Sequence, residues 1–139
     1  MKNKKPLTKS TMSVKTITSL VILTASIIIS GLYAHKLLRD DSDMLVKAID
    51  EIVQSSSSGD WRGSADKMQQ MTDQWQRIRR TWSSLIDHQE IDNIDVTLSR
   101  LKILIEIRDI TSLMPEAAAL RKIVGHIPEK ESLTIDNIF

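Results

Sequence analysis

Residues 61–85 read WRGSADKMQQMTDQWQRIRRTWSSL, and a large apolar side chain returns in this segment at every seventh position. The returning residues are Trp61, Met68, Trp75 and Trp82, and a second series, three residues after the last three of these, is Met71, Ile78 and Leu85. Two such series are the a and d positions of a packed helix. The pattern predicts a helix over 60–87 with Asp60 as its N-cap. We interpret the tryptophans as core residues, the alternative being a ligand or cofactor box.

The segment that follows, residues 90–114, predicts a second long helix. Its inner stripe keeps the same spacing and consists of Ile91, Ile94, Leu98, Leu101 and Ile105. Acidic and other polar residues, Asp92 and Asp95 among them, form the opposite stripe. Because only a short link around His88 and Gln89 joins the two segments, we expect them to pack as an antiparallel hairpin.

A proline and a glycine predict the boundaries of the next helix. Pro115 is expected at its first position, where a missing N–H costs nothing, and Gly125 is expected to end it. His126, Ile127 and Pro128 would then turn the chain. The apolar residues of the segment 132–139 predict a tail that docks across the bundle, since a free tail would expose them.

Upstream of the tryptophan segment, residues 40–53 predict a helix with Leu45, Ile49 and Ile52 on its inner face. Its acids, Asp40, Asp41 and Asp43, are expected in the first turn, where the helix dipole favours negative charge. The sequence also allows this helix to continue directly from the segment before it. The serines and glycine of residues 55–59 predict a flexible linker.

The N-terminal part of the chain predicts a membrane span. Residues 16–34 carry no charged side chain, and a helix of this length is about 28 Å long, close to the hydrocarbon thickness of a bilayer. A cleaved signal peptide is the alternative, but its apolar region is shorter and Tyr33 stands where a small residue is needed. We therefore expect a cytoplasmic tail over 1–15, a transmembrane helix over 16–35 and an extracytoplasmic domain over 36–139.

The charge distribution indicates the orientation of that span. Residues 1–35 contain five lysines and no acid, whereas the remaining residues contain 14 Lys and Arg against 18 Asp and Glu, a net charge of −4. Lysines on one side of a span mark its cytoplasmic side. The folded domain lacks the clustered cations of a nucleic-acid-binding surface, so no nucleic-acid partner is expected. The chain has no cysteine, which excludes disulfides and thiolate metal sites.

Together these segments predict an all-α protein: an N-terminal transmembrane helix, then a small antiparallel helical bundle with a docked C-terminal tail. The four glycines and three prolines are too few for the turns of an all-β fold.

Three strings resemble a known family: WSSLIDHQEIDNID at 82–95, HIPEKE at 126–131 and the ending NIF at 137–139. They are similar to the short membrane-anchored bacterial proteins of the domain of unknown function four-three-six-three. The resemblance covers the anchor and almost all of the domain after it. It implies a bacterial envelope protein at the cell membrane, with a multi-span membrane protein encoded beside it as a partner. It carries no known chemistry.

Two clusters are candidate sites. His88, Asp92 and Asp95 share a helical face if the segment is helical, and a histidine with carboxylates is a possible set of metal ligands. The competing interpretation, which we favour, is helix capping beside a solvated acidic face, with no metal and no cofactor. The second cluster is a candidate interaction site, although a helix-ending turn explains it too. It comprises His126, Pro128, Glu129, Lys130, Glu131 and Phe139.

The functional prediction follows from the anchor and from what the sequence lacks. It contains no phosphate-binding glycine loop, nucleophile elbow or cysteine, so we do not expect an enzyme. The first hypothesis is an interaction or accessory subunit of a membrane complex, with the lipid bilayer and a membrane protein, or a second copy, as partners. The alternative is an extracytoplasmic domain that senses a small molecule or metal and acts through a partner.

Overall fold

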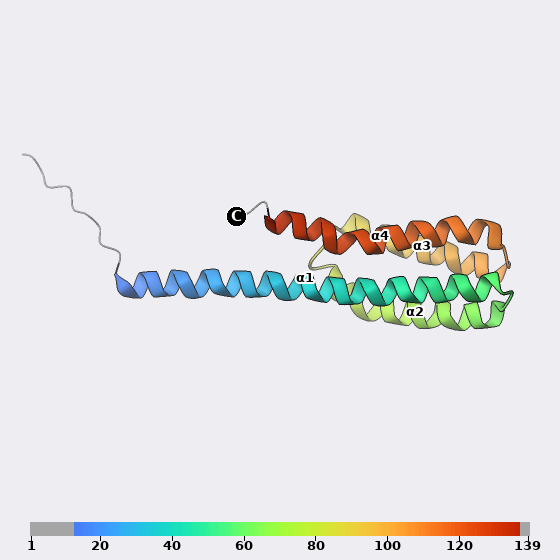
Figure 1. The fold of residues 1–139 in the computed structure, drawn as a ribbon, viewed down its shortest axis with the longest axis horizontal. Coiled ribbons are helices and arrows are strands. Elements are labelled where there is room, and N and C mark those ends of the chain that lie inside the picture. The colour runs from blue at the N-terminus through green and yellow to red at the C-terminus, as the bar shows by residue number, and fades with distance from the viewer. Residues whose placement is uncertain (1–12, 137–139) are drawn as a thin grey trace, which may run out of the picture. The chain divides into compact units, whose positions relative to one another are not determined.

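The structure is a computed structural model that describes residues 13–136, with side chains described through residue 130. Within these residues it contains four helices and no strand (Figure 1). The helices are α1 (Val14–Ser57), α2 (Trp61–Trp82), α3 (His88–Glu106) and α4 (Ile110–Asp136). The all-α prediction, with a long apolar helix before a helical bundle, is confirmed. The chain divides into two units that meet between Leu32 and Tyr33, and we describe each by itself.

The described part of the first unit is the apolar beginning of α1. Its large side chains, from Val14 to Leu32, are exposed. Its hydroxyls are satisfied within the helix: Ser19 Oγ donates to the Lys15 carbonyl at 2.9 Å, and Ser30 Oγ donates to the Ser26 carbonyl at 2.8 Å. This helix is long and apolar enough to cross a membrane. Hydroxyls that donate to the carbonyls of their own helix leave no unsatisfied donor toward lipid.

The second unit begins within α1, which continues without a break to Ser57. The helix therefore runs directly on from the apolar segment, as the sequence allowed, and does not begin at Asp40. The prediction that Asp40, Asp41 and Asp43 lie in a first turn is wrong, since they lie in the middle of α1. No glycine or proline interrupts residues 32–57, so nothing in the backbone stops the helix there. The inner face was predicted correctly, since Leu45, Ile49 and Ile52 are buried.

The predicted serine linker is also wrong. Ser55, Ser56 and Ser57 belong to α1, and the first two are buried. Their small side chains lie against the start of α2, where Ser56 Oγ donates to Ser64 Oγ at 2.9 Å. The turn comes two residues later, at Gly59, whose φ of +81° suits glycine. Asp60 then caps α2 as predicted, because its side chain accepts from Gly63 N.

The tryptophan segment forms the centre of the core. Met68, Met71, Trp75 and Trp82 are buried and Trp61 is half-buried, so the tryptophan seam closes within one chain. The rings of Trp75 and Trp82 meet edge to face, with centroids 5.6 Å apart and planes at 89°. Helix α2 ends at Trp82, five residues before the predicted end, where Ser83 Oγ donates to the Arg79 carbonyl at 2.8 Å.

Hydrogen bonds between helices define an antiparallel arrangement. The end of α2 meets the middle of α1, where Trp82 Nε1 donates to Asp41 Oδ2, and the first half of α2 meets the end of α1, where Lys67 Nζ donates to the Glu51 carbonyl. Helices α3 and α4 pair in the same way through Lys130 with Glu90 and Arg100 with Glu116. Ser42 Oγ of α1 donates to the Val124 carbonyl of α4 at 2.9 Å. The second unit is therefore a closed four-helix bundle that uses the later part of α1 as its first helix.

The predicted extent of the second long helix is wrong at both ends. Helix α3 begins at His88, with Asp87 as its N-cap, and ends at Glu106 instead of Met114. Arg108 adopts a left-handed conformation with φ of 57°, which stops the helix. Asp109 then accepts a hydrogen bond from Ser112 N at 3.1 Å at the start of α4. Hydrogen bonds from the Ser112 side chain and backbone hold the pKa of the Asp109 carboxyl below its ordinary value.

The conformation of Arg108 leads to a prediction. A left-handed backbone costs a residue with a Cβ about 1 kcal/mol, and glycine avoids that cost. We expect Arg108→Gly to raise the free energy of unfolding by about 0.5–1 kcal/mol, although the unfolded chain gains freedom. Thermal unfolding of the full chain in a neutral detergent, followed by circular dichroism, measures the change. A lower Tm than the parent protein would contradict the proposed strain at this position.

Helix α4 contradicts the predicted boundaries at Pro115 and Gly125. It contains Pro115, Gly125 and Pro128 in its interior, so the predicted turn at 126–128 is helical. Helix α4 continues through these residues because one of its faces is continuously buried. Each apolar side chain on that face contributes about 1.5–3 kcal/mol when it is buried, whereas an interior proline costs about 3 kcal/mol. That face comprises Leu113, Ala117, Leu120, Val124 and Ile127.

The predicted C-terminal tail falls largely outside the described part of the chain. The helical backbone of α4 extends to Asp136, so most of the segment 132–139 continues a helix and does not begin a separate tail. Side chains after residue 130 are not described, and docking of the tail across the bundle stays a prediction.

Candidate functional site

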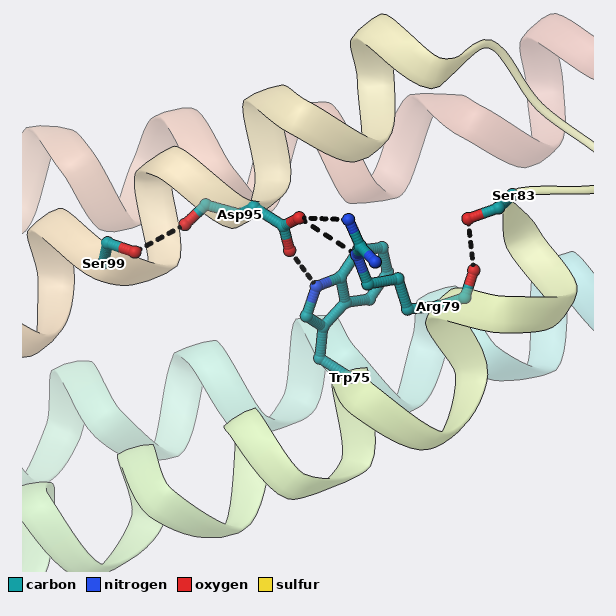
Figure 2. Close-up of polar contacts among 5 residues, drawn as sticks. All are labelled: Trp75, Arg79, Ser83, Asp95 and Ser99. Carbon is teal, nitrogen blue, oxygen red and sulfur yellow. Dashed lines mark hydrogen bonds and ion pairs between the residues drawn. The ribbon is translucent and has the colours of Figure 1, made fainter.

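Asp95, one of the three candidate metal ligands, is engaged by two residues of α2 (Figure 2). Its Oδ1 accepts from Trp75 Nε1 at 2.6 Å, and its Oδ2 lies 3.0 Å from Arg79 Nε and 2.9 Å from Nη2 of the same guanidinium group. The carboxylate therefore satisfies the one polar atom of a buried tryptophan. In this arrangement Asp95 joins α2 to α3.

The other two candidate ligands lie apart from that contact. His88 is the first residue of α3, and Asp92 follows it one turn later; both side chains are exposed. Among the residues whose side chains the structure describes, no three histidine, aspartate or glutamate side chains gather in a way that would hold a metal ion. The exposed position of His88 and Asp92 agrees with the capping and solvated-face interpretation.

The predicted interaction residues lie on the last described turns of α4. His126 Nδ1 is 3.4 Å from Glu129 Oε2, and Lys130 Nζ is 2.9 Å from Glu90 Oε1 of α3. Pro128 is buried, whereas the side chains of His126, Glu129 and Lys130 are exposed. The Glu131 side chain and Phe139 lie outside the described part of the chain. The string at 126–131 therefore forms one helical surface, and the predicted loop is absent.

Three of these residues line a groove between α1 and α4 of the bundle, which we call the α1–α4 groove. It is open, with a volume of about 920 Å³. Its ionisable lining from α1 is His35, Arg39 and Asp43; that from α4 is Arg121, Lys122, His126 and Glu129. Three cations, Arg39, Arg121 and Lys122, line the groove against two acids, Asp43 and Glu129, so the groove is basic although the bundle as a whole is acidic.

Sequence reasoning missed most of this lining. His35 with Arg39, and Lys122 with His126, are each four residues apart, which places each pair on one face of a helix. That spacing was a usable signal. Nothing in the sequence indicated that the two pairs face each other, because that arrangement requires α4 to continue through Gly125 and Pro128 and to pack on α1.

A second surface, which we call the α3 apolar strip, lies on the side of α3 that faces away from the core. Val96, Ile103 and Ile107 follow each other at intervals of seven and four residues and are 49%, 56% and 64% exposed. Met114 of α4 is also exposed, and Ile103 shares a shallow depression of about 430 Å³ with Pro115 of α4. Their helical spacing places Val96, Ile103 and Ile107 on one side of α3, which differs from exposed apolar residues scattered over a surface.

Comparison with known proteins gives one match. The family described as domain of unknown function DUF4363 matches residues 32–138, which are most of this chain. Searches of curated proteins and of solved structures gave no match. The matched range contains the bundle, the α1–α4 groove and the α3 apolar strip, and it confirms the family seen in the sequence. It begins at residue 32, so it does not include most of the anchor that the resemblance was expected to cover. The chain belongs to the DUF4363 family.

Proposed function

We propose that this protein is a single-span membrane protein of the bacterial cell membrane whose helical bundle lies outside the cell membrane. The exposed apolar beginning of α1 supports the span, since such a surface is stable in lipid and unfavourable in water. The lysines of residues 2–15 support a cytoplasmic N-terminus.

We further propose that the bundle is an interaction subunit that docks on another membrane protein. The α3 apolar strip carries this proposal. The bundle already buries its tryptophan core, so these side chains are not needed for folding within the chain. Burying an exposed isoleucine in an interface contributes about 1.5–3 kcal/mol to binding. A few such residues can supply most of the binding free energy of a specific interface. Binding in place of catalysis is consistent with the absence of a recognisable catalytic motif in the sequence.

Photo-cross-linking in native membranes tests this function. A photoreactive amino acid placed at Ile103 is expected to capture one multi-span membrane protein, identified by mass spectrometry. The same group at Gln76, an exposed position of α2, is the matched control and should capture none. An adduct with twice the mass of the chain would assign the strip to self-association. Equal labelling from both positions would contradict a docking role for the strip.

A variant separates docking from folding. Ile103→Asp combined with Ile107→Asp is expected to abolish the cross-linked adduct, because two charges would be buried without partners in the interface. Since both side chains are more than half exposed, the Tm of the isolated protein should change by no more than a few degrees. A large fall in Tm would mean that the strip stabilises the bundle itself.

A second function, recognition of a small molecule outside the membrane, is favoured by one observation, the basic α1–α4 groove. It would place a ligand between the helix that follows the span and the last helix of the bundle. The charged residues that line the groove indicate the chemistry of such a ligand.

A further inference from the structure

The α1–α4 groove contains cations that the bundle does not neutralise. Arg39 and Lys122 are exposed and have no ion-pair partner among the described side chains, although they line the same groove. Arg121 pairs with Asp50 at 3.2 Å, yet its side chain is 57% exposed and keeps donors available. Ion pairs elsewhere on the bundle show that acids are plentiful, so the charge left in this groove is a local property.

The acids that face the groove do not cancel these charges. Glu129 lies 3.4 Å from His126, and Asp43 is exposed on α1 one turn after Arg39, without a contact to it. One carboxylate is thus shared with a histidine, and the other is solvated. A ligand that enters the groove therefore meets two uncommitted cations, with Arg121 beside them.

His35 adds an unsatisfied polar atom to the same wall. Its Nδ1 is buried and has no hydrogen-bond partner among the described residues. Buried polar atoms without partners are rare because burial removes their hydrogen bonds to water. His35 itself lines the groove, so a ligand bound there lies beside this side chain.

The position of His35 in the chain indicates where such a ligand comes from. It is the first ionisable residue after the uncharged segment 16–34, and Arg39 follows one helical turn later. If that segment spans the bilayer, as the proposed function has it, these two residues lie at the level of the lipid headgroups. The inference therefore rests on the proposed membrane anchor, though it does not involve the α3 apolar strip.

We propose that the α1–α4 groove binds the phosphate headgroup of an anionic membrane lipid. Arginine and lysine are the side chains that phosphate oxygens prefer, through charge-assisted hydrogen bonds. Basic pockets between helices at the membrane surface bind such headgroups, and about 920 Å³ is ample room for a glycerol phosphate. Arg39 and Lys122 contact the phosphate from opposite walls, and Arg121 and His35 complete the donor set.

Binding is measured with the full chain in a neutral detergent. Native mass spectrometry counts bound phosphatidylglycerol, phosphatidylcholine and free glycerol phosphate, and the Tm is recorded with each. Phosphatidylglycerol is expected to bind and to raise the Tm, because a ligand that binds only the folded state stabilises it. Arg39→Gln with Lys122→Gln should weaken that binding about tenfold or more, since charge-assisted contacts are lost. Arg62→Gln with Arg77→Gln removes the same charge from exposed positions of α2 and should not.

Each outcome decides the proposal. Loss of phosphatidylglycerol binding in the groove variant alone supports it, provided that the variant keeps the parent Tm without lipid; Arg39→Lys, which keeps the charge, should retain most of the binding. Equal stabilisation by free glycerol phosphate through the same residues would replace the lipid with a soluble anion. Equal binding of phosphatidylcholine, or equal loss in both double variants, would overturn it. Membrane fractionation of the same variants reports anchoring separately, so a failed anchor is distinguishable from a failed groove.

Discussion

Replacing Trp82 with alanine is expected to lower the free energy of unfolding by about 3–5 kcal/mol, as for other buried large-to-small changes. Trp82 is fully buried, packs edge to face on Trp75 and donates its Nε1–H to Asp41 Oδ2 at 3.0 Å. The change would leave a cavity at the junction of α1 and α2 and would remove the aromatic contact. A domain of this size is stable by about 5–15 kcal/mol, so the change removes a large share of that stability.

The conservative variant Trp82→Phe separates the contribution of apolar packing from that of the hydrogen bond to Asp41. Phenylalanine keeps most of the apolar contact but lacks the N–H, so we expect a loss of about 1–2 kcal/mol. Thermal and denaturant unfolding of the full chain in neutral detergent, followed by circular dichroism, gives both values. If alanine and phenylalanine cost the same, the hydrogen bond to Asp41 and not the packing would dominate.

Asp95→Ala is the second large expected effect, a loss of about 2–3 kcal/mol. The variant leaves Trp75 Nε1–H without an acceptor although the Trp75 side chain is buried, and an unsatisfied donor costs about 1–3 kcal/mol. It also removes the pair with Arg79, which contributes less because the two side chains are 41% and 33% exposed. The same unfolding measurement reports the loss.

Asp92→Ala is the matched control for this prediction. Asp92 lies on the same helix three residues earlier and is exposed, and its replacement should change stability by no more than about 0.5 kcal/mol. Asp95→Asn, which retains an acceptor for Trp75, should fall between the two. Equal losses from Asp92→Ala and Asp95→Ala would mean that net acidity of α3, and not the contact with Trp75, accounts for the effect.

Local capping chemistry was predictable at Asp60 but was missed at Asp109, which was expected inside a helix. Asp60 was expected to cap α2 and does so, because its side-chain oxygen reaches Gly63 N within three residues. The heptad series correctly placed Met68, Trp75 and Trp82 in the core. In both cases the information lies within a few residues of the feature that it determines.

The helix ends were predicted less well, because glycine and proline were treated as stops. Within α4, Pro115, Gly125 and Pro128 are overridden by a buried face that continues on both sides of them. Conversely, α3 ends at Glu106 although neither glycine nor proline follows it closely. Its end is marked by Arg108, which adopts a left-handed conformation that glycine normally occupies. Packing against neighbouring helices therefore outweighs backbone preference at four positions.

The amino-acid pattern alone establishes the helical class, the apolar beginning of α1, the buried tryptophan seam and the family, because each depends on residue spacing within one segment. The tertiary structure decides the rest. It joins Asp95 to Trp75 and Arg79, and it brings His35 and Arg39 of α1 opposite Lys122 of α4. These residues are far apart in the sequence, and no local periodicity encodes which helix faces meet when the bundle closes.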